Sequence, residues 1–277
     1  MDKNEVFYDD KQFVAPTYAR FNVAFERGEG SRLYDINGEE YIDCATGIGV
    51  NIFGVCDDVW KSAVTEQLNK IQHTSNLYYS LPQAELAKLL CQKTGAKKVF
   101  FGNSGAEANE CAIKVARKYG NTKYGRNEII TLKNSFHGRT IATLSATGQD
   151  EFHKYFDPFL AGFKYAAPDM DDIISCYTDK TCAVMVECIQ GESGVHVLDY
   201  DFLRELEKFC KSRDILLICD EVQCGNGRTG KMYAYEHAGI HPDIVTTAKG
   251  LGGGLPIGAC MPFGECADTF AYGGHGS

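Results

Sequence analysis

Two reactive side chains, Asp220 and Lys249, each follow a short apolar segment of the chain. The first segment is Ile215–Cys219 and the second is Ile244–Ala248. Apolar runs of this length between polar or glycine-rich loops are typical of buried strands in a parallel sheet. Ligands of open α/β sheets bind beyond the carboxyl ends of such strands. The sequence therefore predicts that a carboxylate and an amine face one crevice.

This pair of side chains has a specific chemical use. A lysine at the mouth of a buried site can lose its proton and attack a carbonyl group. An aspartate beside it can hold a cationic ring nitrogen. Together these are the two functions that pyridoxal 5'-phosphate (PLP) requires from a protein. Asp220 and Lys249 are therefore the candidate catalytic residues, and PLP is the candidate cofactor.

The elements that position these residues follow from the pattern of apolar residues along the chain. Further strands are expected at 99–101, 128–132 and 183–187, and helices at 57–71, 82–92, 105–119 and 202–211. A β-hairpin is expected over 31–43 around the Asn37-Gly38 turn, whereas 1–30 and 141–178 give weak signals. The alternation of strands and helices predicts an α/β fold with a mostly parallel sheet flanked by helices.

A glycine-containing turn, Ser104-Gly105-Ala106, lies between the expected strand at 99–101 and the helix after it. The free N–H groups and the dipole at such a helix N-terminus bind anions. Ser104 and Glu107 also have the spacing of a capping box. This segment alone favours an ordinary capped helix, but a PLP site elsewhere in the chain would need it as a phosphate site.

Composition and charge exclude several classes of protein. The 277 residues carry a formal net charge of −9 and no run of Lys and Arg, which argues against binding to nucleic acid or to an anionic membrane. The N-terminus has no apolar signal sequence, and no apolar run is long enough to span a bilayer. The 12 cysteines show no zinc-like spacing, so no metal site is expected. Several lie in apolar runs as reduced thiols, which indicates a cytoplasmic protein.

Two glycine-rich segments resemble nucleotide-binding loops without matching them. Gly225 to Lys231 has the spacing of a P-loop, but Met232 stands where the magnesium-binding Ser or Thr is required. Gly252–Gly254 does not follow a first strand or open a helix as a dinucleotide loop does. A nucleotide-binding oxidoreductase is therefore not expected.

An extended pattern over 220–250 resembles the class III PLP-dependent aminotransferases. It comprises Asp-Glu-Val-Gln at 220–223, Gly-x-Gly-Arg-Thr-Gly at 225–230, Pro-Asp at 242–243 and Ala-Lys-Gly at 248–250. The resemblance implies a PLP-dependent transferase of fold type I and a homodimer with shared active sites. It also implies an N-terminal segment at 1–50, with the arm, the hairpin and part of the small domain, followed by the large PLP-binding domain at 51–277. Family members continue beyond the position of Ser277, so a C-terminal truncation is expected.

The same resemblance implies roles for individual residues. The residues expected to bind the cofactor are Ser104, Gly105, Ala106, Phe136, His137, Asp220, Gln223 and Lys249. Arg139, Glu192 and Ser277 are expected to bind substrate. From the residues alone, Phe136 could equally be a core residue and Arg139 a surface ion pair.

The resemblance extends to a possible substrate. The phrase His-Thr-Ser-Asn-Leu-Tyr-Tyr at 73–79 is similar to the branch of the family that acts on N-acetylornithine. We therefore expect transfer of its terminal amino group to 2-oxoglutarate, a step of arginine biosynthesis. Succinyldiaminopimelate, 4-aminobutyrate and ornithine remain alternative donors, and the lack of tyrosine in the loop at 46–51 argues against ornithine. A catalytically incomplete chain that only binds a partner subunit is an alternative of another class.

Overall fold

The computed structural model describes residues 2–277, which divide into two compact units, one extending to Leu77 and the other comprising Tyr78–Ser277. The N-terminal unit contains a three-stranded antiparallel sheet formed by β1 (Phe25–Glu29), β2 (Arg32–Asp35) and β3 (Glu40–Ile42). Its helices are α1 (Lys3–Phe13), α2 (Thr46–Gly49) and α3 (Asp58–Lys70). The predicted hairpin is confirmed as β2 and β3, with Gly38 in the turn at a φ of 84°.

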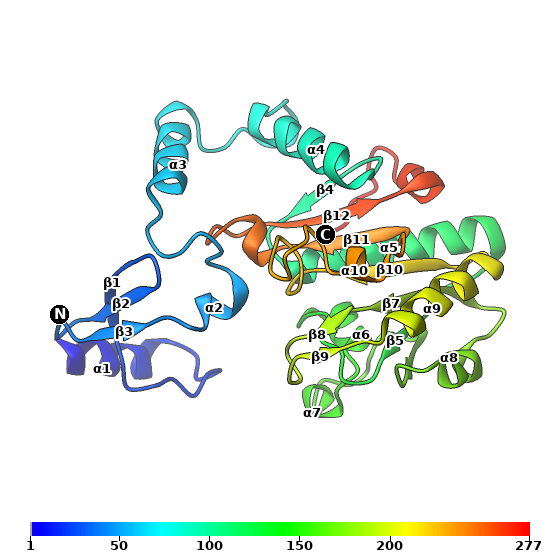
Figure 1. Ribbon diagram of the computed structural model, residues 1–277, viewed down its shortest axis with the longest axis horizontal. Helices are drawn as coiled ribbons and strands as arrows, with labels where there is room; N and C mark the ends of the chain where they lie inside the picture. The colour runs from blue at the N-terminus through cyan, green and yellow to red at the C-terminus, as the bar shows by residue number, and fades with distance from the viewer. Residues whose placement is uncertain (1) are drawn as a thin grey trace. The chain divides into compact units, whose positions relative to one another are not determined.

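The second unit is built on a seven-stranded sheet with the order β4-β12-β11-β10-β7-β5-β6 (Figure 1). Its strands are β4 (Phe100–Gly102), β5 (Glu128–Leu132), β6 (Phe163–Ala166), β7 (Thr181–Val186), β10 (Leu216–Asp220), β11 (Ile244–Thr247) and β12 (Gly258–Pro262). The neighbours from β11 to β6 pair in parallel, and β12 runs antiparallel to both β11 and β4. A separate hairpin pairs β8 (Ile189–Gln190) with β9 (His196–Val197). The expected mostly parallel sheet is thus confirmed.

Helices cover both faces of this sheet, so its central strands are apolar on both sides. In β10, Leu217 and Cys219 pack into one hydrophobic core, and Leu216 and Ile218 pack into the other. The first core is closed by α9 (Tyr200–Ser212), with α8 (Met170–Cys176) and α10 (Tyr235–Ala238). The second is closed by α5 (Gly105–Tyr124) (Figure 1). This double burial explains the continuous apolar runs that precede Asp220 and Lys249.

All four expected helices are present, with shifted ends, and those at 57–71 and 202–211 are α3 and α9. The expected helices at 82–92 and 105–119 form as α4 (Leu81–Thr94) and α5, the latter reaching Tyr124. On α4, Leu90 is buried as expected, but Leu89, also expected to face inward, is 50% exposed. The weakly patterned stretch at 141–178 holds α6 (Ile141–Ala146), α7 (Asp150–His153), β6 and α8. Helix α1 and strand β1 lie in the N-terminal stretch that gave little signal.

Candidate active site

Asp220 ends β10, and its carboxylate has three hydrogen-bond partners. Its side chain is 3% exposed. Its Oδ2 accepts hydrogen bonds from Nδ2 of Asn109, at 2.7 Å, and lies 2.8 Å from Nδ1 of His137. Its Oδ1 accepts one bond, from the N–H of Val222 at 3.0 Å. The carboxylate is therefore fixed in orientation by groups from α5, from the loop after β5 and from its own loop.

His137 is held on three sides. Its backbone carbonyl accepts a hydrogen bond from Nδ2 of Asn109 at 2.8 Å, and its backbone N–H donates to Oγ1 of Thr147 at 3.0 Å. Because Nδ1 faces the carboxylate of Asp220, the proton of the neutral ring belongs on Nδ1. Within residues 2–277, the buried atoms Nε2 of His137 and Oδ1 of Asn109 have no hydrogen-bond partner.

Lys249 lies two residues after the end of β11 (Ile244–Thr247), directly after the apolar run that ends at Ala248, and is partly buried. Its φ of 47° lies in the left-handed region, which a non-glycine residue adopts only when its surroundings impose it. One such constraint is Asn226, whose Nδ2 donates to Oγ1 of Thr247 at 2.9 Å and to the carbonyl of Ala248 at 3.0 Å. Burial lowers the pKa of the Lys249 amine, while the nearby carboxylates of Asp220 and Glu187 oppose that shift. The structure thus favours a lysine that can act as a free amine.

The N-terminus of α5 lies at the end of β4 and offers free backbone N–H groups. Oγ of Ser104 accepts from the N–H of Glu107 at 3.2 Å, and the carboxylate of Glu107 accepts from the N–H of Asn103. No acceptor within the described chain takes the N–H groups of Gly105 and Ala106. Together with the dipole of the 20-residue helix, they form a site for an anion.

Glycine is required near this N-terminus for packing. A Cβ on Gly105 would lie 2.6 Å from Cγ1 of Val222, and one on Gly258 would lie 2.0 Å from the carbonyl oxygen of Ser104. A glycine at this position also lets a phosphate approach the backbone closely. In the structure, contact with the loop after Asp220 is sufficient reason for that glycine. These close contacts join the anion site to Asp220.

Phe136, Arg139 and Gln223 were expected at the site, and the structure gives each of them definite contacts. The guanidinium carbon of Arg139 lies 3.9 Å from the ring centroid of Phe152 and 5.5 Å from that of Phe136. The side chain of Arg139 is exposed and forms no ion pair within residues 2–277, so the alternative of a surface ion pair finds no support. Gln223 lies over Gly191, where a Cβ would be 1.5 Å from Oε1 of Gln223.

Glu192 and Ser277 are exposed and contribute less defined contacts. Oε2 of Glu192 accepts a hydrogen bond from Nε2 of Gln149 at 2.8 Å. Ser277 follows Gly276, which packs so tightly on Cys111 of α5 that an added Cβ would lie 2.6 Å from Cβ of Cys111. The substrate-binding roles expected for Glu192 and Ser277 stay predictions.

Three buried polar residues of this region were not predicted from the sequence: Asn109, Glu187 and Glu221. Glu187 is 5% exposed, and its Oε2 accepts the N–H of Phe136 at 2.9 Å. Burial, reinforced by the charge of Asp220, raises the pKa of the Glu187 carboxyl well above its usual value. The signal for Glu187 was its place at the end of an apolar strand, the same signal that identified Asp220.

Glu221 has a structural role beside the site. It is fully buried and accepts the N–H groups of Ala234 and Tyr235, both at 2.8 Å, and the thiol of Cys224 at 3.1 Å. Burial raises its pKa to about 7, because desolvation outweighs these three donors. Glu221 therefore fixes the chain between Asp220 and α10.

Replacing Glu221 by glutamine is expected to change how stability depends on pH. A carboxyl whose pKa is raised by folding stabilises the folded state fully below its unfolded pKa and loses that contribution as pH rises through the folded pKa. From pH 4.5 to above 7, the wild type should thus lose about 3 kcal/mol of unfolding free energy relative to Glu221→Gln. Urea unfolding at pH 5, 6, 7 and 8 measures this, with the exposed Glu205→Gln on α9 as control. A variant that loses stability relative to wild type at high pH would contradict the raised pKa.

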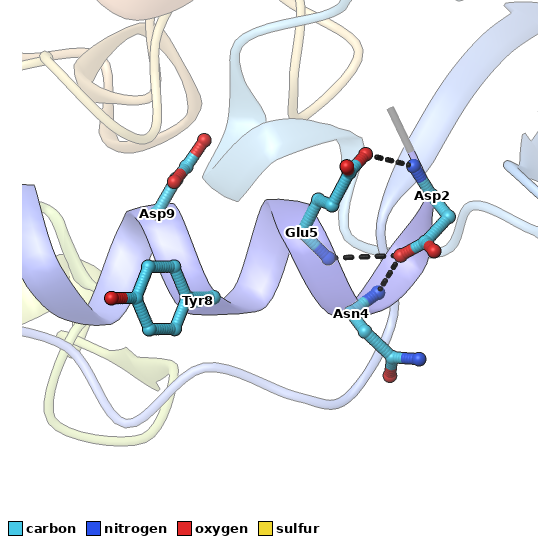
Figure 2. Close-up of a pocket in the computed structure, with 5 residues that line it drawn as sticks. All are labelled: Asp2, Asn4, Glu5, Tyr8 and Asp9. Carbon is cyan, nitrogen blue, oxygen red and sulfur yellow. Dashed lines mark hydrogen bonds between the residues drawn. The ribbon is translucent and has the colours of Figure 1, made fainter.

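A separate hollow lies beside the N-terminus of α1 and is lined by Asp2, Asn4, Glu5, Tyr8 and Asp9 (Figure 2). The carboxylates of Asp2 and Glu5 cap the helix. Oδ1 of Asp2 accepts the N–H groups of Asn4 and Glu5, and Oε2 of Glu5 accepts the N–H of Asp2. Because the carboxylates of Asp2 and Glu5 are used as helix caps, the hollow is a weaker candidate site than the one around Asp220.

Comparison with known proteins assigns the family. The model of the aminotransferase class-III family matches residues 13–277. The chain belongs to the class III aminotransferases. It is 51% identical to the acetylornithine aminotransferase of Haemophilus ducreyi, over 100% of this chain and 72% of that protein. Members of this family are PLP-dependent transaminases, and this class III aminotransferase is one of them.

Solved structures agree with this class III assignment. The ornithine aminotransferase of Toxoplasma gondii has a TM-score of 0.94 at 32% identity, over 100% of this chain and 67% of that one, with PLP at partial occupancy in its active site. The N-acetylornithine aminotransferase of Stenotrophomonas maltophilia has a TM-score of 0.79 at 39% identity, over 92% of this chain and 65% of that one.

The residues around Asp220 fit PLP. The free N–H groups at the N-terminus of α5 suit a phosphate, and Oδ1 of Asp220 keeps a lone pair for a cationic ring nitrogen. Lys249 supplies an amine whose protonated form is destabilised by burial. The unpartnered Nε2 of His137 is a further polar atom that the protein alone leaves unsatisfied.

Proposed function

We propose that this class III aminotransferase transfers the terminal amino group of N-acetylornithine to 2-oxoglutarate, with Asp220 and Lys249 as its catalytic residues. The observation that supports the chemistry is the partly buried lysine beside a buried, hydrogen-bonded aspartate. The choice of substrate is supported by 51% identity to a named acetylornithine aminotransferase over the whole of this chain.

In this proposal, some residues of the chain bind the cofactor and others transfer or hold protons. When bound, PLP supplies an electron sink for breaking bonds next to the substrate nitrogen. Lys249 would hold the cofactor through its amine and, as a free amine, would take up on Nζ the proton from the substrate carbon that bears the reacting nitrogen. Asp220 holds a proton on the ring nitrogen. The N–H groups of Gly105 and Ala106, with Ser104, bind the phosphate.

Other residues orient the bound molecules. Phe136 covers the cofactor ring, and its backbone is fixed by the hydrogen bond to Glu187. Gln223 binds the ring oxygen, and His137 supports Asp220. Arg139 binds a substrate carboxylate remote from the reacting amine, a task for which its planar guanidinium group is suited. Glu192, in the loop after β8, would contribute to substrate binding.

Replacing Arg139 by lysine is expected to raise KM about tenfold for both N-acetylornithine and glutamate. Lysine keeps the charge but loses the planar group that lies 3.9 Å from the ring centroid of Phe152 and can bind a carboxylate through two nitrogens. Stopped-flow measurement of the two half-reactions checks this, with Arg204→Lys on α9 as control. If only the glutamate half-reaction is affected, Arg139 does not bind N-acetylornithine.

The substrate is tested by a panel of amino donors. The purified holoenzyme is assayed with N-acetylornithine, ornithine, 4-aminobutyrate and succinyldiaminopimelate, and glutamate formed from 2-oxoglutarate is measured. The highest kcat/KM should be for N-acetylornithine. A higher kcat/KM for another donor would identify that donor as the substrate instead. A lack of turnover with a normal cofactor spectrum would favour a chain that only binds a partner subunit.

We also propose that the protein acts in the cytoplasm as a homodimer with shared active sites. All 12 cysteines are free in the structure, a state that a reducing compartment maintains. No helix within residues 2–277 combines the length and apolar content needed to cross a bilayer. Sedimentation velocity at several concentrations tests the dimer.

A further inference from the structure

We propose that Asn109 is a positioning residue of the cofactor site, which holds the His137–Asp220 pair together and leaves Oδ1 of Asp220 to meet the ring nitrogen. This inference rests on the proposed role of Asp220. Asn109 lies five residues after Ser104 on α5, is 1% exposed, and touches both members of the pair.

The contacts of Asn109 fix the orientation of its amide group. Nδ2 lies 2.8 Å from the carbonyl oxygen of His137 and 2.7 Å from Oδ2 of Asp220. Both neighbours are acceptors, so only the NH2 group can face them, and both of its hydrogens are used. The buried Oδ1 of Asn109 has no partner within residues 2–277. Asn109 thus contributes two donors, which no apolar residue can supply.

These donors determine which oxygen of Asp220 is available. Oδ2 is engaged by Asn109 and by Nδ1 of His137, whereas Oδ1 accepts only the N–H of Val222. A carboxylate oxygen has about two acceptor positions, so Oδ1 retains one and Oδ2 retains none. Without Asn109, the carboxylate would lose one of the bonds that hold its plane, and Oδ2 would compete with Oδ1 for the ring nitrogen.

Asn109 also connects two parts of the site through one rigid element. The anion site at Ser104, Gly105 and Ala106 opens α5, and Asn109 follows about 7.5 Å further along the same helix. The carboxylate that faces the ring nitrogen is therefore tied to the helix that binds the phosphate. A residue in this position acts on the cofactor through Asp220 and without touching the reacting atoms.

The test compares two cofactors in three variants of the holoenzyme. Asn109→Leu removes both donors at similar volume, Asn109→Ser is smaller and keeps one donor in case leucine prevents folding, and Asn121→Leu is an exposed control on α5. Equilibrium binding is measured for PLP and for its carbocyclic analogue, in which CH replaces the ring nitrogen. The protonation of ring-15N-labelled PLP is followed by NMR as a function of pH.

We expect Asn109→Leu to weaken PLP binding about tenfold or more and Asn109→Ser less, because a bond to a charged acceptor is lost. Binding of the analogue should change less than about twofold, because no ring nitrogen meets Asp220. The ring nitrogen should also lose its proton at lower pH in Asn109→Leu than in wild type. Asn121→Leu should match wild type in every measurement.

Two other outcomes separate this inference from the proposed function. If Asn109→Leu and Asn109→Ser weaken the binding of PLP and of the analogue equally, Asn109 is a packing residue and the inference is overturned. The same holds if the binding of both ligands is unchanged. If Asp220→Asn leaves the protonation of the ring nitrogen unchanged, the role of Asp220 fails, and the inference fails with it.

Discussion

Replacing Lys249 by alanine is expected to reduce turnover by on the order of 10⁴-fold while the sheet still folds. The variant loses both the amine that attaches the cofactor and the group that moves the proton. Nothing nearby substitutes for it, because the other ionisable groups that act on Lys249 are the acids Asp220, Glu187 and Glu192 and the thiol of Cys224. The left-handed φ of 47° destabilises the folded state with either lysine or alanine at position 249, so the free energy of unfolding should change little.

Borohydride reduction followed by peptide mapping tests the same assignment. In the wild type, the cofactor should remain attached to the peptide that contains Lys249. Lys231→Ala, in the exposed loop before α10, is the control and should label and turn over as the wild type does. Label on any other lysine would show that Lys249 is not the attachment site.

Asp220→Asn should lower kcat by roughly 10³-fold. An amide cannot hold a proton on the ring nitrogen as a carboxylate does. In addition, the NH2 group of the new asparagine must face a hydrogen-bond donor. That donor is either the N–H of Val222 or the pair formed by Nδ2 of Asn109 and Nδ1 of His137. A variant within a factor of two of the wild type would show that Asp220 only supports the fold.

The matched control for this substitution is Asp243→Asn at the opposite end of the sheet. Oδ2 of Asp243 accepts the N–H of Leu217 at 2.8 Å and so anchors the start of β11 to β10. Thermal unfolding should show that Asp243→Asn is destabilised, while its turnover per folded molecule stays near that of the wild type. The pair of variants thereby separates a structural acid from a catalytic one.

Five of the seven strands of the large sheet could be predicted, because burial leaves a continuous apolar run in the sequence, whereas β6 and β12 were missed. For the same reason Asp220 and Lys249, which directly follow such runs, were found without a structure. Asn109 could not be found, because its role comes from pairing with residues far away in the chain. Helix α1 buries no side chain and was missed, whereas α3 was predicted at 57–71 although its side chains are also at least partly exposed.

The antiparallel strand β12 has a consequence for the order in which the chain can fold. Strand β4 joins the sheet only through β12, with Phe100 pairing with Cys260, and Gly258 packs on the backbone of Ser104. Such a pairing closes a very long loop and therefore forms slowly. During synthesis, the turn at Ser104 stays without its support until the chain beyond Pro262 has left the ribosome. We therefore expect the anion site at the N-terminus of α5 to form late in the nascent chain, after the parallel strands have assembled.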